Sequence, residues 1–128
     1  MKIPYSGAME GDINIIEDHG LLIIEVMVEK FDFFLISDHA DRLRGILAER
    51  CYPPALFDCT RVKVIDSSVF GFLLEIRNAM KMKGREIAVV CVDPEALHVM
   101  EMLKVPRFIR VFPSRAGAIE YLNSLGVL

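Results

Sequence analysis

Residues 56–84 read LFDCTRVKVIDSSVFGFLLEIRNAMKMKG, and we expect the rest of the chain to be arranged around this stretch. Residues 56–59 and 62–65 are short apolar runs of the kind that form strands. Asp66, Ser67 and Ser68 follow where a helix begins, because the residues after them carry apolar side chains at helical spacing. The stretch therefore predicts a strand, a polar turn and a helix.

The predicted helix over residues 69–82 is amphipathic. Its apolar positions recur at i, i+3, i+4, i+7 and i+11, which places them on one face; these positions are Val69, Phe72, Leu73, Ile76 and Met80. We expect this face to pack on a sheet. Gly84, just past the end, suits the left-handed conformation that closes many helices.

Two roles fit the polar turn that starts this helix. Oxygens of Asp66, Ser67 or Ser68 can accept hydrogen bonds from the N–H groups of the first helical turn, which is ordinary capping. Capping needs only one of these residues. Two hydroxyls and a carboxylate together also place a serine oxygen at the positive end of the helix dipole, where a phosphate would be stabilised.

Composition narrows the class of protein. The 128 residues are 53 % hydrophobic and 26 % charged, which predicts one folded domain over residues 1–128. A net charge of −3 gives no attraction to nucleic acid or to an anionic membrane surface. The three cysteines cannot all pair, and no apolar run approaches the roughly 20 residues of a membrane span. We therefore expect a cytoplasmic protein that binds a protein partner or a small ligand.

The N-terminal part of the chain predicts an arm, a hairpin and a helix. Residues 1–11 show no periodicity and are expected to form a loose arm or an edge strand. Two β-rich runs within residues 14–28 are separated by a polar turn with a glycine, which indicates a hairpin. Residues 29–32 break the pattern, and Ser37 or Asp38 is the expected cap of the first helix.

The C-terminal part alternates strands and helices. Residues 87–92 are an unbroken apolar run, typical of a strand covered on both faces. Asp93 and Pro94 open a further helix, residues 108–112 form a last strand, and Ser114 caps a final helix. The order predicts an α/β fold in which a mixed β-sheet with an N-terminal antiparallel hairpin carries about four packed helices.

The sequence shows no constellation of catalytic or metal-binding residues. His39 lies between Asp38 and Asp41, but on a helix these neighbours point in different directions, so a metal site is not expected there. No Gly-rich phosphate loop, cysteine pair at metal spacing, nucleophile elbow or dinucleotide fingerprint occurs. The sequence therefore predicts a protein that is not an enzyme and has no cofactor or metal.

These motifs resemble the STAS domain of bacterial anti-sigma factor antagonists. The likeness rests on four features. Asp58 ends a strand, and Ile65-Asp66-Ser67-Ser68 opens a helix with an acid and two serines. Gly84 precedes an apolar strand, and Phe31-Asp32 places a hydrophobic residue and an Asp before the first helix. Residues 118–122 resemble the C-terminal helix of that family, so the likeness runs along most of the chain.

The resemblance implies a fold and a site. The family's fold is a small mixed sheet with helices against one face. In that family the serine after the Asp is phosphorylated by a partner kinase that is also the anti-sigma factor, and here this serine is Ser67. The resemblance places partner binding on Asp32, Asp66, Ser67, Ser68, Val69 and Phe70. The sequence departs from the family at Val69, where Gly is usual, and a bulky side chain there would hinder a kinase or reshape its docking surface.

Three functions follow from these observations. The first, which we favour, is a non-enzymatic switch that binds a serine kinase, anti-sigma factor or signalling scaffold and is turned off by phosphate on Ser67. The second is a transporter accessory subunit or a small-ligand or lipid-binding domain, since some STAS proteins resemble subunits that sit against a transporter ATPase. The third is an enzyme or phospho-acceptor receiver using Asp58, for which no second carboxylate plus lysine is spaced to complete an acidic pocket.

Overall fold

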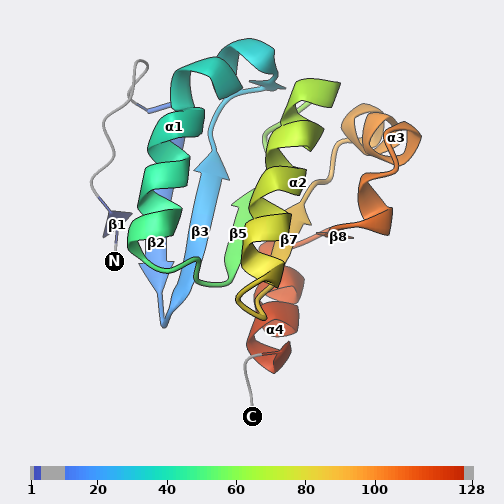
Figure 1. Cartoon of the computed structure of the whole chain (residues 1–128). Coiled ribbons are helices and arrows are strands. Elements are labelled where there is room, and N and C mark those ends of the chain that lie inside the picture. The colour runs from blue at the N-terminus through green and yellow to red at the C-terminus, as the bar shows by residue number, and fades with distance from the viewer. Residues whose placement is uncertain (1, 4–10, 126–128) are drawn as a thin grey trace.

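The computed structural model describes residues 2–3 and 11–125, and within them a hairpin is followed by alternating helices and strands (Figure 1). The strands are β1 (Lys2–Ile3), β2 (Ile13–Asp18), β3 (Leu21–Val26), β4 (Lys30–Phe31), β5 (Ala55–Asp58), β6 (Val64–Ile65), β7 (Ile87–Val90) and β8 (Arg110–Phe112). The helices are α1 (Phe33–Glu49), α2 (Ser67–Lys81), α3 (Pro94–Met102) and α4 (Arg115–Leu125), with a 3₁₀ turn η1 (Val105–Arg107).

The strands form one large mixed sheet and one small ribbon. The large sheet has the order β1-β2-β3-β5-β7-β8, in which β1, β2 and β3 pair antiparallel and β3, β5, β7 and β8 pair parallel. The remaining strands, β4 and β6, pair parallel with each other. The predicted mixed sheet with an N-terminal antiparallel hairpin and four helices is confirmed for the described residues.

The hairpin turn has the conformation that its residues favour. Asp18 pairs with Leu21, which leaves His19 and Gly20 as a two-residue loop. Both have positive φ, 51° and 82°, as the tightest hairpin turns require. The β1 strand pairs with the other side of β2 at the outer edge of the sheet.

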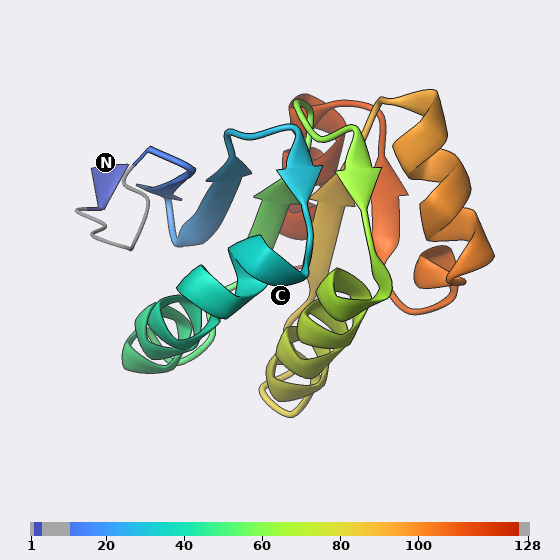
Figure 2. The same cartoon turned by 90° about the horizontal axis from the view of Figure 1, so that it is seen from above.

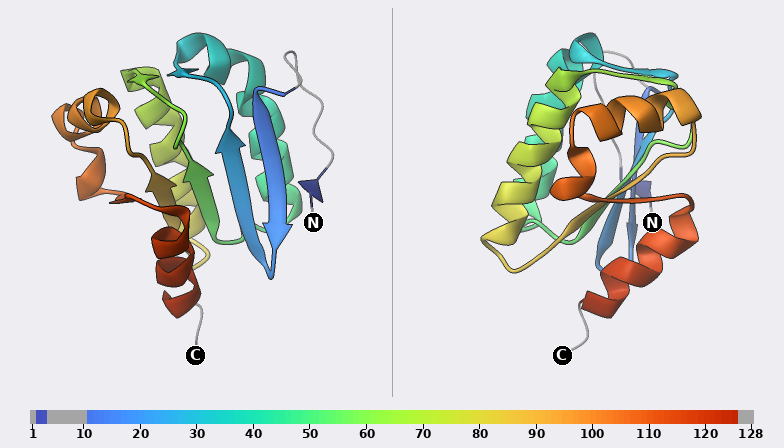
Figure 3. Two further views of the ribbon diagram at one scale, coloured as in Figure 1. Left: turned by 180° about the vertical axis from the view of Figure 1, so that it is seen from behind. Right: turned by 90° about the vertical axis from the view of Figure 1, so that its right-hand side faces the viewer.

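Helices cover both faces of the large sheet (Figures 2 and 3). The larger apolar cluster lies between α1, α2, α3 and one face, and a smaller cluster joins α4 to the other face. Within β3, Leu22 and Ile24 enter the larger cluster, whereas Leu21 and Ile23 enter the smaller one. The expectation that the helices pack against one face is therefore wrong for α4. Its residues Ala118 and Leu122 shield apolar side chains that strands without alternation present on the second face.

The first helix begins earlier than predicted. Asp32 is its N-cap and accepts a hydrogen bond from the Leu35 N–H at 3.2 Å, so Ser37 and Asp38 lie inside α1 and do not cap it. The break expected at residues 29–32 contains strand β4 and this cap. Because β4 has only two residues and they pair with residues of β6 that lie 34 positions further on, no local pattern marks it as a strand.

Helix α2 follows its sequence pattern closely. Its five predicted core residues, from Val69 to Met80, are at most 4 % exposed. At its end, Gly84 has φ of 70°, the Gly84 N–H donates to the Lys81 carbonyl, and the Arg85 N–H donates to the Met80 carbonyl. These two bonds form a Schellman cap, which is the role predicted for Gly84.

Among the described residues, every helix is too short or too polar to cross a lipid bilayer.

Candidate functional site

Two helix N-termini lie side by side at one end of the molecule, where β4 leads into α1 and β6 leads into α2 (Figure 2). The parallel pairing matches Phe31 with Ile65, so the residues that follow, Asp32 and Asp66, are neighbours. Each aspartate is the N-cap of its own helix. The small ribbon therefore sets the spacing of two helix starts that are far apart in sequence.

The carboxylate of Asp66 ties these two helices together. Its Oδ1 accepts hydrogen bonds from the N–H groups of Ser68 at 3.0 Å and Val69 at 3.3 Å. Its Oδ2 accepts a hydrogen bond from the N–H of Phe33, the first residue of α1, at 3.0 Å. One side chain thus satisfies backbone donors in the first turns of both helices.

Ser67 is exposed at the first position of α2. Asp66 fills the capping role for which the sequence offered three residues, and within residues 11–125 the Ser67 hydroxyl makes no hydrogen bond. The hydroxyl is therefore accessible and adjacent to the positive end of the helix dipole. The neighbouring Asp66 carboxylate makes the site polar.

The other residues predicted for partner binding differ in how much surface they offer. Asp32, Asp66, Ser68 and Phe70 are half-buried, and the Phe70 ring packs 6.1 Å from the ring of Phe108. The Val69 side chain is fully buried in the core. It lies away from the surface, so this β-branched residue does not obstruct access to Ser67.

Sequence reasoning missed two residues at this end of the molecule. Phe33 and Phe34 in the first turn of α1 are 55 % and 75 % exposed, and their rings contact edge to face at 5.7 Å. The helical spacing of the apolar residues could have revealed them. The buried positions of α1 run from Leu35 and Ile36 to Leu47, and Phe33 and Phe34 precede them. Placing the helix start at Ser37 or Asp38 hid that spacing.

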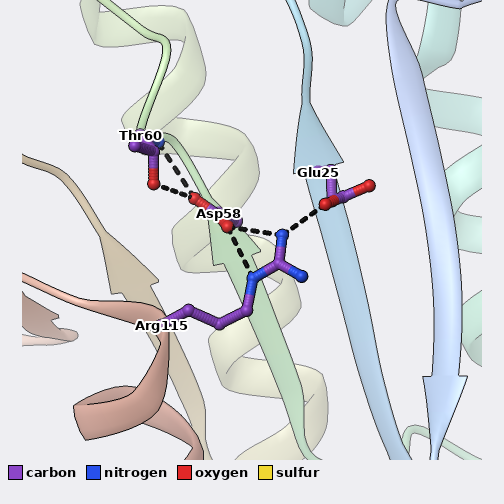
Figure 4. A network of polar contacts seen from close by, with 4 residues as sticks. All are labelled: Glu25, Asp58, Thr60 and Arg115. Atoms are coloured by element: carbon purple, nitrogen blue, oxygen red, sulfur yellow. Dashed lines mark hydrogen bonds and ion pairs between the residues drawn. The ribbon is translucent and has the colours of Figure 1, made fainter.

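A second polar cluster surrounds Asp58 at the carboxyl end of β5 (Figure 4). The Arg115 Nε donates to Asp58 Oδ2 at 2.8 Å, and the Arg115 Nη2 contacts both Asp58 and Glu25. On the other side, the Thr60 N–H donates to Asp58 Oδ1 at 3.0 Å and the Thr60 hydroxyl donates to the same oxygen. Both Asp58 oxygens are therefore engaged.

Electrostatics explains why Asp58 is tolerated at 7 % exposure. Burial alone raises the pKa of Asp58, but the hydrogen bonds from Thr60 and Arg115 outweigh it, so this pKa lies below its usual value. Burial lowers the pKa of Arg115, but its bonds to Glu25 and Asp58 outweigh that effect and the pKa is raised. The cluster is a charged, mutually satisfied network.

The structure corrects one detail of the receiver hypothesis for Asp58. A second carboxylate does lie beside it, because the parallel pairing of β3 and β5 places Glu25 opposite Asp58. A cavity of about 240 Å³ opens there, and its charged lining comes from Glu25, Asp58, Arg61 and Arg115. Arg115 bridges the two acids, so the Asp58 oxygens that a phosphoryl transfer would need are already bonded.

The histidine and cysteine residues do not form a further site. His39 is fully buried on α1, with its Nε2 3.8 Å from Asp12 Oδ2. Cys59 and Cys91 are buried, and burial raises the pKa of both thiols, which keeps them protonated and unreactive. In the part of the chain that the structure describes, no three His, Cys, Asp or Glu side chains are grouped to hold a metal ion.

Comparison with known families and structures agrees with this architecture. The STAS domain model matches residues 12–118 of the chain. No curated protein sequence matches the chain significantly. The family match thus spans the large sheet from β2 to the first turn of α4, and both polar clusters lie inside it.

Several solved structures share the fold at low sequence identity. An anti-sigma-factor antagonist (STAS) domain protein from Planctomyces limnophilus is similar with a TM-score of 0.70 and 13 % identity, covering 92 % of this chain and 100 % of that one. The anti-sigma factor antagonist SpoIIAA, in its unphosphorylated form, has a TM-score of 0.68 and 12 % identity, covering 91 % of this chain and 98 % of that one. A sulfate transporter family protein from Wolinella succinogenes has a TM-score of 0.69 and 23 % identity, covering 86 % of this chain and 90 % of that one.

Proposed function

The chain belongs to the STAS domain family, and on that premise we propose that it is a non-enzymatic binding switch of the anti-sigma factor antagonist kind. In this proposal a serine kinase, which is also the anti-sigma factor or part of a signalling scaffold, binds the end of the molecule that carries the starts of α1 and α2. Phosphate on Ser67 releases that partner.

The proposal rests on one observation: Asp66, and not Ser67, caps helix α2. Asp66 caps α2, which leaves the Ser67 hydroxyl exposed and without a structural hydrogen bond among residues 11–125. A serine that merely capped the helix would be held by the backbone and shielded. An accessible hydroxyl beside the positive end of a helix is suited to accept a phosphoryl group, because the dipole stabilises the dianion that forms.

A second observation supports access by a kinase. Val69, the position where the family's usual Gly is absent, points into the core and is 0 % exposed. Apart from Val69, the residues that the sequence predicts for partner binding beside Ser67 are partly accessible: Asp32, Asp66, Ser68 and Phe70. The Val69 side chain therefore does not stand between a kinase and this serine.

The test begins with co-purification from native cells and identification of the bound ATPase. The purified ATPase, ATP and Mg²⁺ should add one phosphate to the full chain, and fragmentation mass spectrometry should place it on Ser67. Ser67→Ala should abolish the modification, and Ser68→Ala is the matched control that should retain it. Phosphate on Ser68, or no phosphate from any kinase of the native cell, would contradict the proposal.

A second candidate function is the transporter accessory subunit. It is favoured by the likeness to the sulfate transporter family protein, whose 23 % identity is the highest of the three structures compared above. The same co-purification separates the two candidates. A membrane transporter in place of a histidine-kinase-like ATPase would support the accessory role and overturn the switch.

A further inference from the structure

The N-terminal turn of α1 carries an apolar surface that the fold does not use. Phe33 and Phe34 are 55 % and 75 % exposed and contact each other edge to face. The buried stripe of α1 begins one residue later, at Leu35. Phe, like Tyr and Trp, is enriched in the cores of protein interfaces relative to the rest of the surface, so two adjoining exposed rings point to a protein contact.

This apolar pair is fixed next to the phospho-acceptor site. The Phe33 N–H donates to Asp66 Oδ2, and Ser67 is the residue after Asp66. The starts of α1 and α2 lie at the same end of the molecule in two views (Figures 1 and 2). A protein that binds at the Ser67 hydroxyl can therefore also contact the first turn of α1.

The charges around the pair indicate the chemistry of what binds there. Asp38 follows Phe34 by one helical turn, is exposed, and has no ion-pair partner within residues 11–125. Asp32 caps the same helix and Asp66 bonds to the Phe33 N–H, so three carboxylates lie along the first turns of α1. The complementary surface is an apolar pocket with a basic rim.

We propose that Phe33 and Phe34, flanked by Asp38, form the docking anchor for the kinase that phosphorylates Ser67, and that this kinase receives them in an apolar pocket rimmed by Lys or Arg. The inference rests on the proposed function and adds a specificity determinant to it. The anchor holds the chain on the kinase, and Asp66 holds the anchor at a constant position relative to Ser67 through the Phe33 backbone.

The test uses the full chain and the purified ATPase that phosphorylates wild-type Ser67. Phe34→Ala should lower kcat/KM for phosphorylation of Ser67 at least tenfold, mainly through a higher KM, because the serine and its surroundings are unchanged. Phe33→Ala should act in the same direction and keeps the backbone N–H that bonds to Asp66. Phe34→Leu should retain most of the efficiency, and Asp38→Lys should reduce it several-fold, most strongly at low salt.

Met82→Ala is the matched control, since Met82 is 89 % exposed and lies at the far end of α2. It should leave kcat/KM unchanged, and the thermal midpoint of every variant should match that of the wild type. If Ser67 is phosphorylated equally well in Phe34→Ala, Phe33→Ala and Met82→Ala, the docking anchor is disproved while the proposed function stands. If no kinase phosphorylates wild-type Ser67, both fail.

Two further measurements test whether something other than a kinase covers Phe33 and Phe34. Analytical ultracentrifugation of the chain alone should show the same species for wild type and Phe34→Ala. A wild-type dimer that Phe34→Ala dissociates would identify a second copy as the occupant and overturn the proposal. Flotation with phosphatidylcholine and phosphatidylglycerol vesicles should show no binding, and binding that Phe34→Ala removes would assign the pair to a lipid surface instead.

Discussion

Asp66 is bonded to backbone donors of two helices, so its removal should cost more than the loss of an ordinary cap. Asp66→Ala should lower the free energy of unfolding by about 1–3 kcal/mol, combining a lost N-cap with a lost bond to the Phe33 N–H. Asp93→Ala is the matched control, because Asp93 caps α3 alone through Glu95 and Ala96. Equal losses in urea unfolding would show that the bond between helices contributes nothing.

Ser67 offers a separate test, in which charge should change binding more than folding. A phosphate or carboxylate at Ser67 gains from the helix dipole and loses by repulsion from Asp66, so the net change in stability should stay within about 1 kcal/mol. At an interface, a desolvated and unpaired charge costs several kcal/mol, which corresponds to a hundredfold or greater loss of affinity. Ser67→Asp should therefore release the partner that Ser67→Ala binds.

The measurements are the thermal midpoint and the partner affinity of both variants. Tight binding by Ser67→Asp would refute the switch, and so would a loss of binding that merely follows unfolding.

Single residues also show where sequence reasoning reached its limit at the site. The string Asp66-Ser67-Ser68 predicted a helix start, but it left open which residue caps the helix, because all three have suitable oxygens. The structure assigns the cap to Asp66. Ser68→Ala is consequently expected to be nearly neutral, since the Ser68 backbone N–H donates to Asp66 and its hydroxyl does not cap.

At the scale of elements, α4 is attached to the sheet by a small apolar contact and by Arg115. Arg115→Met should lower the free energy of unfolding by about 1–3 kcal/mol, because it removes the guanidinium that bridges Glu25 and Asp58. The loss should fall short of that for a fully buried pair, since the Arg115 side chain is 36 % exposed. Arg107→Met, at an exposed position in η1, should change stability by less than about 0.5 kcal/mol.

The same network predicts how stability depends on pH. The folded state depresses the pKa of Asp58 below its unfolded value of about 3.9, so the folded state binds this proton less readily. The stabilisation is therefore complete above roughly pH 5, where the unfolded carboxyl is ionised, and is lost as the pH falls through the lower folded pKa. Asp58→Asn should show a smaller loss of stability between pH 5 and pH 2 than the wild type in urea titrations. An equal loss of stability between pH 5 and pH 2 in Asp58→Asn and the wild type would contradict this role of Asp58.

Elements with a strong local pattern were predictable, and elements defined by distant partners were not. The apolar face of α2 and its Gly84 cap follow from residues that are close together in the sequence, and the structure has both. Strand β4 exists only because β6 pairs with it, so the sequence shows a break there instead. The nearness of Glu25 to Asp58 likewise depends on the register of β3 against β5, which no spacing in the chain reveals.

For the whole molecule, we expect binding without turnover of a substrate. Both Asp58 oxygens are engaged by Thr60 and Arg115, and the buried thiols have raised pKa values. A broad hydrolase and phosphatase screen of the purified chain should therefore find no activity. Activity that persists through purification and disappears in Asp58→Asn or Ser67→Ala would contradict this prediction.

The bond from the Phe33 N–H to Asp66 has one more consequence, for measurements of hydrogen exchange. First-turn amides of a helix ordinarily exchange quickly because they lack a partner in their own helix. The Phe33 amide has a partner 33 residues away in sequence, so its exchange is governed by the opening of the contact between α1 and α2. A single amide signal in an NMR spectrum would thus follow the separation of two helices and respond to any group, phosphate included, that draws Asp66 away.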